Sequence, residues 1–371
     1  MKGNMDLNGL PPIKVVGVGG AGCNAVNRMI REGIHGVHFL AVNTDAQQLQ
    51  HSEAPERMRI GDKVSRGLGV GGNPEMGYKS ADESRDELLQ ALKGMDMVFV
   101  AAGMGGGTGT GAAPVVAEVA KMAGALTIAV VTKPFAFEGG KRRAVAEAGI
   151  ARLQEFADTV IVIPNDRLLE RNAENDLTVT AAFELADDIL RQGIAGISDV
   201  IMVPGEVNLD FNDVKKIMGE GGQAHMAIGQ GRGDNRAVDA AKRAIASPLL
   251  ETDITGARKV LYNVTSSGTL RLGELNMAAQ VIQEMVDPEA EIIFGTAIDP
   301  SLGDEVKVTL IATGFPAPAH RRTAETAAVE RPRWSSEILD ELGLAGDDVE
   351  LPAFLRKRRA TAPALTIDGR N

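Results

Sequence analysis

The first half of the chain alternates short apolar runs with segments whose apolar residues recur every three or four positions. Apolar runs of this length predict buried strands, and the segments between them predict helices. Strands separated by helices pair in parallel, so this half predicts an α/β fold with a doubly wound parallel sheet and binding sites at the carboxyl ends of its strands. The predicted strands are residues 13–19, 37–42, 97–102, 125–132 and 159–163.

The rhythm changes in the second half of the chain. Residues 176–202 predict one long helix, and residues 208–214 open another. A second, smaller α/β domain is predicted after residue 222, and the long helix is expected to bridge the two domains. Its strands are expected at 224–229, 260–266, 291–297 and 306–313, and its helices near 235–246 and 271–286.

Two further segments of the first half have their own patterns. Residues 46–78 form a long polar connection with a glycine cluster at 67–72, and connections of that length in a compact domain tend to be functional loops, here one that senses a nucleotide. Residues 81–93 predict a single amphipathic helix.

The end of the chain changes in composition. Residues 317–348 are rich in Ala, Pro, Thr and Arg, which is typical of a disordered linker. The tail, residues 349–371, has an apolar motif followed by basic residues 356–359, and such a motif on a solvated tether predicts a partner. The expected segments are an N-terminal arm (1–12), a first domain (13–175), the long helix with its following loop (176–222), a C-terminal domain (223–316), the linker and the tail.

Composition excludes several classes of protein. The net charge of the chain is -11, and residues 317–371 hold nine basic and nine acidic groups, so the acidic excess lies in the body. An acidic body argues against nucleic-acid binding. No apolar run reaches the roughly 18 residues of a membrane span, and a single cysteine fits a reducing cytoplasm. The five histidines lack metal-ligand spacing, so no metal site built from side chains is expected.

A glycine-rich turn follows the predicted strand 97–102. Residues 105–111 read Gly-Gly-Gly-Thr-Gly-Thr-Gly, and residues 112–123 then have helical spacing. Glycines at the start of a helix let an anion approach unpaired backbone N–H groups, so this turn predicts a phosphate cradle. The alternative is a flexible linker of small residues.

An earlier turn allows a different interpretation. Gly17, Gly19 and Gly22 match the dinucleotide-binding fingerprint, and Asp45 follows at the expected spacing, so an NAD-dependent oxidoreductase is an alternative. It leaves the turn at 105–111 unexplained and has no evident hydride-handling side chains. Cys23 in this turn is either a small residue that fills a tight space or a nucleophile. No P-loop motif occurs in the chain, which disfavours a Ras-like mechanism.

Together these motifs resemble the tubulin/FtsZ superfamily, and residues 13–316 with the tail motif resemble the bacterial FtsZ family within it. Besides 105–111, the resemblance rests on residues 16–24, 43–47, 133–139, 163–166, 186–188 and 208–214. It implies a GTP-binding domain, a central helix and a smaller C-terminal domain. It also implies a GTPase that polymerises head to tail into protofilaments and forms the cell-division ring in the cytoplasm, at midcell under the inner membrane.

The resemblance implies a role for each matching residue, with GTP bound, GDP as product and Mg²⁺ carried with the nucleotide. The phosphates would be held by Gly20, Ala21, Gly22, Cys23, Asn24, Gly107, Thr108 and Gly109, the ribose and nucleotide by Glu138 and Arg142, and guanine by Asn165, Phe183 and Asp187. A carboxylate at Asp187 suits guanine because it can accept from both N1–H and N2–H₂. Phe183, one helical turn earlier, either stacks on the base or fills the core.

Asp210 and Asp213 lie at the far end of the long helix from the nucleotide. A helix of about 25 residues spans about 38 Å, so this pair cannot easily reach its own GTP. The resemblance implies that the pair enters the nucleotide pocket of the next subunit and orients the attacking water, with Asn208 beside the phosphates. Alternatively, one aspartate only caps the helix that follows.

The tail motif, residues 349–358, resembles the family's docking motif for membrane-tethering division proteins of the FtsA or ZipA kind. Direct contact of residues 356–359 with anionic lipid is the alternative, although four charges without an inserted apolar group bind membranes weakly. A third interpretation of the whole chain is a scaffold that binds nucleotide without hydrolysing it. The presence of both Asp210 and Asp213 argues against that scaffold.

Overall fold

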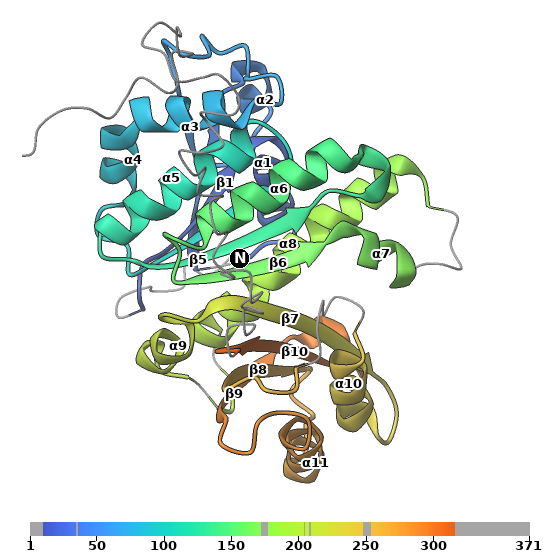
Figure 1. The fold of residues 1–371 in the computed structure, drawn as a ribbon. Coiled ribbons are helices and arrows are strands. Elements are labelled where there is room, and N and C mark those ends of the chain that lie inside the picture. The colour runs from blue at the N-terminus through green and yellow to red at the C-terminus, as the bar shows by residue number, and fades with distance from the viewer. Residues whose placement is uncertain are drawn as a thin grey trace, which may run out of the picture. The chain divides into compact units, whose positions relative to one another are not determined.

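The computed structural model describes residues 10–34, 36–171, 177–203, 205–207, 209–247 and 254–315. It confirms the predicted α/β class, with a large, mostly parallel sheet, a long helix and a smaller second sheet (Figure 1). The N-terminal nine residues, the linker and the tail lie outside the described residues.

Six strands form the parallel part of the sheet in the order β3-β2-β1-β4-β5-β6. This order is also that of dinucleotide-binding folds, so topology alone does not exclude the NAD alternative. The strands are β1 (Ile13–Val18), β2 (Val37–Asn43), β3 (Glu56–Arg59), β4 (Met97–Gly103), β5 (Leu126–Lys133) and β6 (Thr159–Pro164).

Helices cover both faces of this sheet and bury its apolar strands between two cores. One core joins the sheet to α1 and α8, and the other joins it to α3, α4, α5 and α6. The helices up to this point are α1 (Gly19–Arg31), α2 (Ala46–Gln50), α3 (Pro74–Glu83), α4 (Arg85–Leu92), α5 (Thr108–Met122), α6 (Gly140–Leu153), α7 (Asn165–Arg171) and α8 (Val179–Met202), with a short 3₁₀ turn η1 (Ala136–Glu138).

The second sheet is joined to the first at one narrow place. β7 pairs in parallel with β6 over three residue pairs and then pairs antiparallel with β10. β10 pairs antiparallel with β8, and β8 pairs in parallel with β9. α10 and α11 pack on this sheet around a third core. The elements are α9 (Phe211–Met218), β7 (Gly222–Gly231), α10 (Arg236–Ile245), β8 (Lys259–Ser266), α11 (Leu272–Gln283), β9 (Glu291–Ile298), the 3₁₀ turn η2 (Pro300–Leu302) and β10 (Val306–Thr313).

α8 is the long helix that the sequence predicts. It begins at Val179 because the Thr178 side chain accepts a hydrogen bond from the N–H of Ala181 and caps the first turn. α8 contacts α1 and β5 on one side and β9 on the other, so it touches both parts of the sheet.

Two expectations differ from the structure. The connection 46–78 contains three elements: the Asp45 side chain caps α2, the polar edge strand β3 pairs with β2, and Asn73 caps α3, whose first residue is Pro74. The single helix expected over 81–93 is two helices, because Ser84 leaves the helical conformation at φ -102°, ψ 19°.

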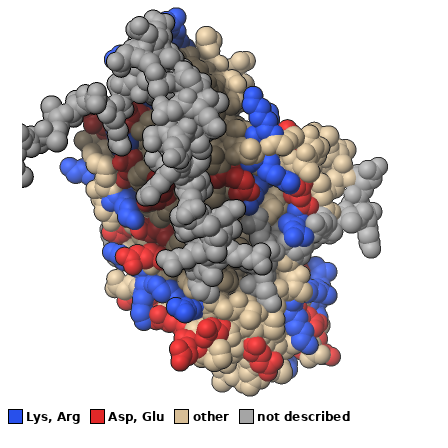
Figure 2. All heavy atoms as spheres, in the orientation of Figure 1, with Lys and Arg blue, Asp and Glu red and all other residues tan. Residues whose placement is uncertain are grey.

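Charged side chains of both signs are interspersed over the face of the molecule seen in Figure 2. Within the described ranges, no helix has the length and apolar character that crossing a membrane requires.

Candidate functional site

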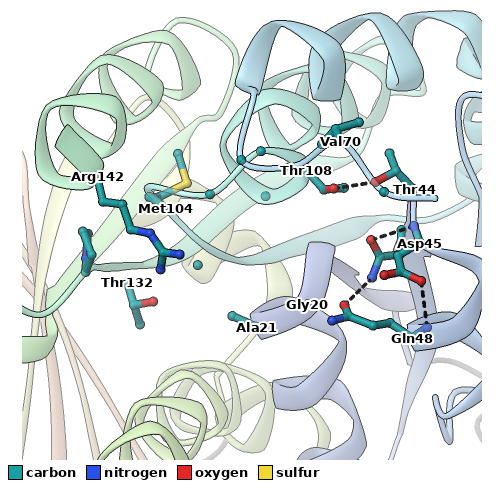
Figure 3. A pocket seen from close by; sticks show the side chains of 18 of the residues that line it. Gly20, Ala21, Thr44, Asp45, Gln48, Val70, Met104, Thr108, Thr132 and Arg142 are labelled. Atoms are coloured by element: carbon teal, nitrogen blue, oxygen red, sulfur yellow. Dashed lines mark hydrogen bonds between the residues drawn. The ribbon is translucent and has the colours of Figure 1, made fainter. Parts of the chain in front are cut away.

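A cavity of about 580 Å³ opens at the carboxyl ends of the parallel strands (Figure 3). Its volume lies in the range of small-molecule sites, roughly 300–1,000 Å³. Ten of the residues predicted from the sequence line it, and they come from five separate segments of the chain. They are Gly20, Ala21, Gly107, Thr108, Gly109, Glu138, Arg142, Asn165, Phe183 and Asp187.

The two glycine turns meet at one end of this cavity. Gly19 has φ +73°, and a Cβ on it would lie 2.8 Å from the backbone nitrogen of Gly109. The turn after β4 is held in shape by Thr110, whose hydroxyl accepts a hydrogen bond from the N–H of Gly105 at 2.8 Å. The backbones of the two turns can approach this closely only because side chains are absent.

The helices that follow these turns start without side-chain caps. Neither α1 nor α5 has its first-turn N–H groups bonded by a capping side chain of the described residues, whereas Asp45 and Asn73 cap α2 and α3 beside the same cavity. Uncapped N–H groups and the positive ends of two helix dipoles therefore face one space. This arrangement suits a phosphate chain.

Sequence reasoning assigned no role to several residues that complete this end of the cavity. The hydroxyls of Thr44 and Thr108 lie 2.6 Å apart and link the turn after β2 to α5, as Figure 3 shows. Asn43 donates to Gln48 at 3.1 Å. The only sequence signals were the match of residues 43–47 to the family and the glycine cluster 67–72, part of which also lines the cavity.

The other end of the cavity carries unpaired acceptors. Asn165 is buried, and its Oδ1 has no hydrogen-bond partner among the described residues. The Asp187 carboxylate accepts no hydrogen bond from them either, and burial raises its pKa to about 7, with Arg28 opposing and Glu184 adding to the shift. Buried acceptors without partners cost free energy unless a ligand supplies donors.

Aromatic rings lie beside these acceptors. Phe183 is partly exposed and makes edge contacts with Phe135 and Phe137, whose own rings are stacked 5.0 Å apart. Phe183 is therefore not enclosed in the core, and one side of its ring is available to a flat ligand.

Arg142 extends from the first turns of α6 into the cavity (Figure 3). Its guanidinium donates to Glu138, and the second carboxylate oxygen of Glu138 accepts from the N–H of Phe135 at 2.9 Å. Both residues line the cavity, so the pair offers it one cation and one anion.

Three predicted residues do not line the cavity. A Cβ on Gly22 would lie 2.3 Å from the carbonyl oxygen of Ala101, so this glycine allows α1 to pack on β4. The Cys23 thiol is buried against the carbonyls of Gly17 and Val42, and burial raises its pKa to about 12. A thiol with this pKa is a poor nucleophile, and Asn24 is exposed on α1.

Asp210 and Asp213 also lie outside this cavity. Asp210 is the N-cap of α9, since its carboxylate accepts from the N–H of Asn212 at 3.0 Å. Asp213, in the first turn of the same helix, has no such role and accepts no side-chain hydrogen bond from the described residues. Asn208 is outside the described residues.

Comparison with known proteins identifies the protein family to which this chain belongs. The family model described as "Tubulin/FtsZ family, GTPase domain" matches residues 12–173, and the one for the FtsZ family C-terminal domain matches residues 222–316. The chain belongs to the tubulin/FtsZ family of GTP-binding GTPases.

Within this family, solved structures of FtsZ from M. jannaschii are similar to the chain. An empty FtsZ dimer is 44% identical, covers 82% of this chain and 88% of its own, and has a TM-score of 0.79. A mutant of the same FtsZ is also 44% identical, covers 83% and 92%, and has a TM-score of 0.80. CetZ1 from Haloferax volcanii, a GDP-bound monomer, is 22% identical over 82% and 94% with a TM-score of 0.71, which supports the fold alone.

Proposed function

We propose that the chain is a cytoskeletal GTPase that polymerises head to tail and forms the division ring at the septum, at midcell. In this proposal each GTPase site is completed between adjacent subunits. The observation that carries the proposal is the separation of two half-sites. Among the described residues, the carboxylates that line the cavity are Asp45, which caps α2, Glu138, which pairs with Arg142, and Asp187 at the base end, whereas Asp210 and Asp213 stand outside it. From Asp187 to the end of α8 the helix rises about 22 Å, which keeps the pair from its own nucleotide.

Guanine is the base that fits the acceptor end of the cavity. Its Watson–Crick edge donates N1–H and N2–H₂, which suits the Asp187 carboxylate and the unpaired Asn165 Oδ1, with Phe183 against the ring. Adenine lacks this pair of donors. The NAD alternative also relies on Asp45, and one oxygen of that carboxylate is already bonded to the N–H groups of Gln47 and Gln48.

Mg²⁺ fits the phosphate end as an ion carried by the nucleotide. No cluster of His, Cys, Asp or Glu suited to a metal occurs among the described residues, and Mg²⁺ commonly binds through substrate phosphates and few protein groups. The hydroxyls of Thr44 and Thr108, which both line the cavity, are the protein ligands proposed for this ion.

In the proposed mechanism, Asp210 and Asp213 of one subunit accept hydrogen bonds from the water that attacks the γ-phosphate held by the next. The uncapped α1 and α5 of that next subunit hold the phosphates and stabilise the charge that develops on them. Asn208 is proposed to lie beside the phosphates. One subunit therefore binds the GTP, and its neighbour orients the attacking water.

Exposed apolar side chains support association on two separate parts of the surface. Leu68, at the rim of the cavity, is 85% exposed, and Leu272, at the start of α11, is 83% exposed. A head-to-tail interface uses two different surfaces and generates an open filament. The FtsZ of M. jannaschii that shares 44% identity was solved as a dimer.

The segments predicted from the sequence each have a role in the same proposal. Residues 13–175, 176–222 and 223–316 would act as nucleotide domain, central helix with catalytic loop, and C-terminal domain. Residues 349–358, beyond the linker 317–348, would bind membrane-tethering division proteins of the FtsA or ZipA kind.

A mixing experiment tests the shared site. Asp213→Asn is expected to bind GTP within about twofold of the original chain but to hydrolyse it about a hundredfold more slowly, because only water orientation is lost. Asp187→Ala, assayed at GTP concentrations that saturate only intact cavities, is expected to be inactive as well. An equimolar mixture should regain activity, since each variant keeps one half-site.

Asp239→Asn is the matched control, because Asp239 occupies the first turn of α10 as Asp213 does that of α9. It should leave turnover unchanged. Full turnover by Asp213→Asn alone, or no recovery on mixing, would show that the site is not shared.

A further inference from the structure

Two helices that contribute opposite ends of the nucleotide cavity are joined by one arginine. α1 begins at the phosphate end with Gly20 and Ala21, and α8 carries Phe183 and Asp187 at the base end. Arg28, in the last turn of α1, donates from Nε to Asp188 at 3.0 Å and from Nη1 to the carbonyl oxygen of Glu184 at 3.4 Å. Arg28 therefore contacts α8 one residue from Asp187 and one turn before it.

Asp188 is the centre of this junction and does not line the cavity. Burial acts to raise its pKa, but hydrogen bonds from Arg191 and Gln192 and the charge of Arg28 lower it overall, so Asp188 stays ionised. Its ion pairs hold the face of α8 that turns away from the cavity. Asp187, the preceding residue of the helix, lines the cavity.

Two charged groups shift the pKa of Asp187 besides burial. Burial raises the pKa of Asp187, the positive charge of Arg28 on α1 lowers it, and Glu184 on α8 raises it. Three other acidic side chains of the described residues have cationic partners of their own: Asp188 with Arg191 on α8, Glu138 with Arg142 at the cavity, and Asp166 of α7 with Arg143.

We propose that Arg28 is a positioning residue for guanine recognition: it fixes α8 against α1 and keeps the Asp187 carboxylate in its acceptor form at the base end of the cavity. This inference rests on the proposed recognition of guanine by Asp187. An ionised carboxylate accepts from both N1–H and N2–H₂, whereas a protonated one loses an acceptor. Arg28 does not line the cavity, so it acts on Asp187 through its positive charge and through its contacts with α8.

The test is the pH dependence of GDP affinity, measured by titration calorimetry between pH 5.5 and 8.5. Affinity should rise with pH until Asp187 is ionised and then level off. Arg28→Gln removes the opposing positive charge, so the midpoint should move up by about half a pH unit and binding at pH 6 should weaken about threefold. Arg28→Lys, which keeps the charge, should have a midpoint close to that of the original chain.

Asp188→Asn tests the direction in which the midpoint moves. It removes a neighbouring negative charge and leaves Arg28 unneutralised, so the midpoint should move to lower pH. Arg31→Gln is the control, because Arg31 is in the same turn of α1 but pairs with Glu53 at the surface. For GTP hydrolysis, Arg28→Gln should raise KM and leave kcat nearly unchanged.

The outcomes separate this inference from the proposed function. If the original chain fails to bind GDP at every pH, the proposed function is wrong. If it binds GDP but Arg28→Gln and Asp188→Asn leave the midpoint in place while lowering the unfolding temperature, Arg28 is a structural link only and the inference is overturned. Opposite shifts in the two variants support it.

Discussion

At the scale of single residues, Asp187 makes stability depend on pH. Its folded pKa, about 7, is raised from the ordinary 3.8 by burial, so the folded state keeps a proton that the unfolded state releases. The stability that the protonated Asp187 contributes is therefore fully present below the unfolded pKa of 3.8 and is lost progressively as pH rises toward 7. Without nucleotide, Asp187→Asn should unfold several degrees higher than the original chain at pH 8 and by a clearly smaller margin at pH 4.5, where only a minor part of the difference has developed.

Differential scanning fluorimetry across this pH range measures the effect. Asp199 has a raised pKa too, about 6, and is present in both proteins, so the difference between them isolates Asp187. An equal difference at pH 4.5 and pH 8 would contradict the assignment.

The predicted phosphate contact of Cys23 needs a test of its own. The family pattern placed it among the phosphate-binding residues, yet its thiol packs under the turn against Gly17 and Val42. Cys23→Ala is expected to keep GDP affinity within about twofold while costing roughly 1 kcal/mol of stability for the lost burial. Titration with GDP measures the affinity, and chemical denaturation measures the free energy of unfolding. A tenfold loss of affinity would show that Cys23 contributes to nucleotide binding.

At the scale of elements, the cradle depends on how closely α3 packs on α5. A Cβ on Gly111 would lie 2.0 Å from the carbonyl oxygen of Pro74 and 2.6 Å from the nitrogen of Tyr78. Gly111→Ala must therefore move α3 or the first turn of α5, and it should lower both the unfolding temperature and GDP affinity, the latter at least tenfold. Gly140→Ala is the control, because nothing lies within 4 Å of a Cβ at the start of α6. Equal unfolding temperatures and GDP affinities of the two variants would show that the contact between α3 and α5 tolerates an added methyl group.

Much of this element structure could be predicted from the sequence. The parallel strands, α8 and the glycine cradle have local signals: apolar runs, helical periodicity and turn residues at fixed spacing. The break between α3 and α4 and the strand β3 do not, because Ser84 is compatible with a helix interior and the polar residues Glu56–Arg59 form a strand only through pairing with β2.

The same distinction applies to the site. The cavity's glycines and Asp187 stand in recognisable motifs, whereas the Thr44–Thr108 contact joins residues 64 positions apart and arises only from the fold. Nor could the sequence distinguish Gly22, which permits packing, from Gly20, which lines the cavity, since both belong to one turn.

At the scale of the whole molecule, the proposed function makes catalysis a property of assembly. The GTPase rate per molecule should rise steeply with protein concentration above a threshold, because a lone subunit lacks the carboxylates of its neighbour. Phosphate release measured over a dilution series checks this, with light scattering at the same concentrations. A rate per molecule that stays flat across the series would contradict the shared site.

The long helix α8 also has a consequence for the order in which the chain folds. Ile128, Val130, Ile161 and Ile163 of β5 and β6 belong to the same core as Ile189, Ile194 and Ile197 of α8. A ribosome adding about 5–20 residues per second needs roughly 2–8 s to proceed from Pro164 to Met202. During that interval the nascent sheet is complete through β6, and the part of it that α8 will cover is still exposed. The helix that later connects the two parts of the sheet is thus also the element that covers these apolar strands during synthesis.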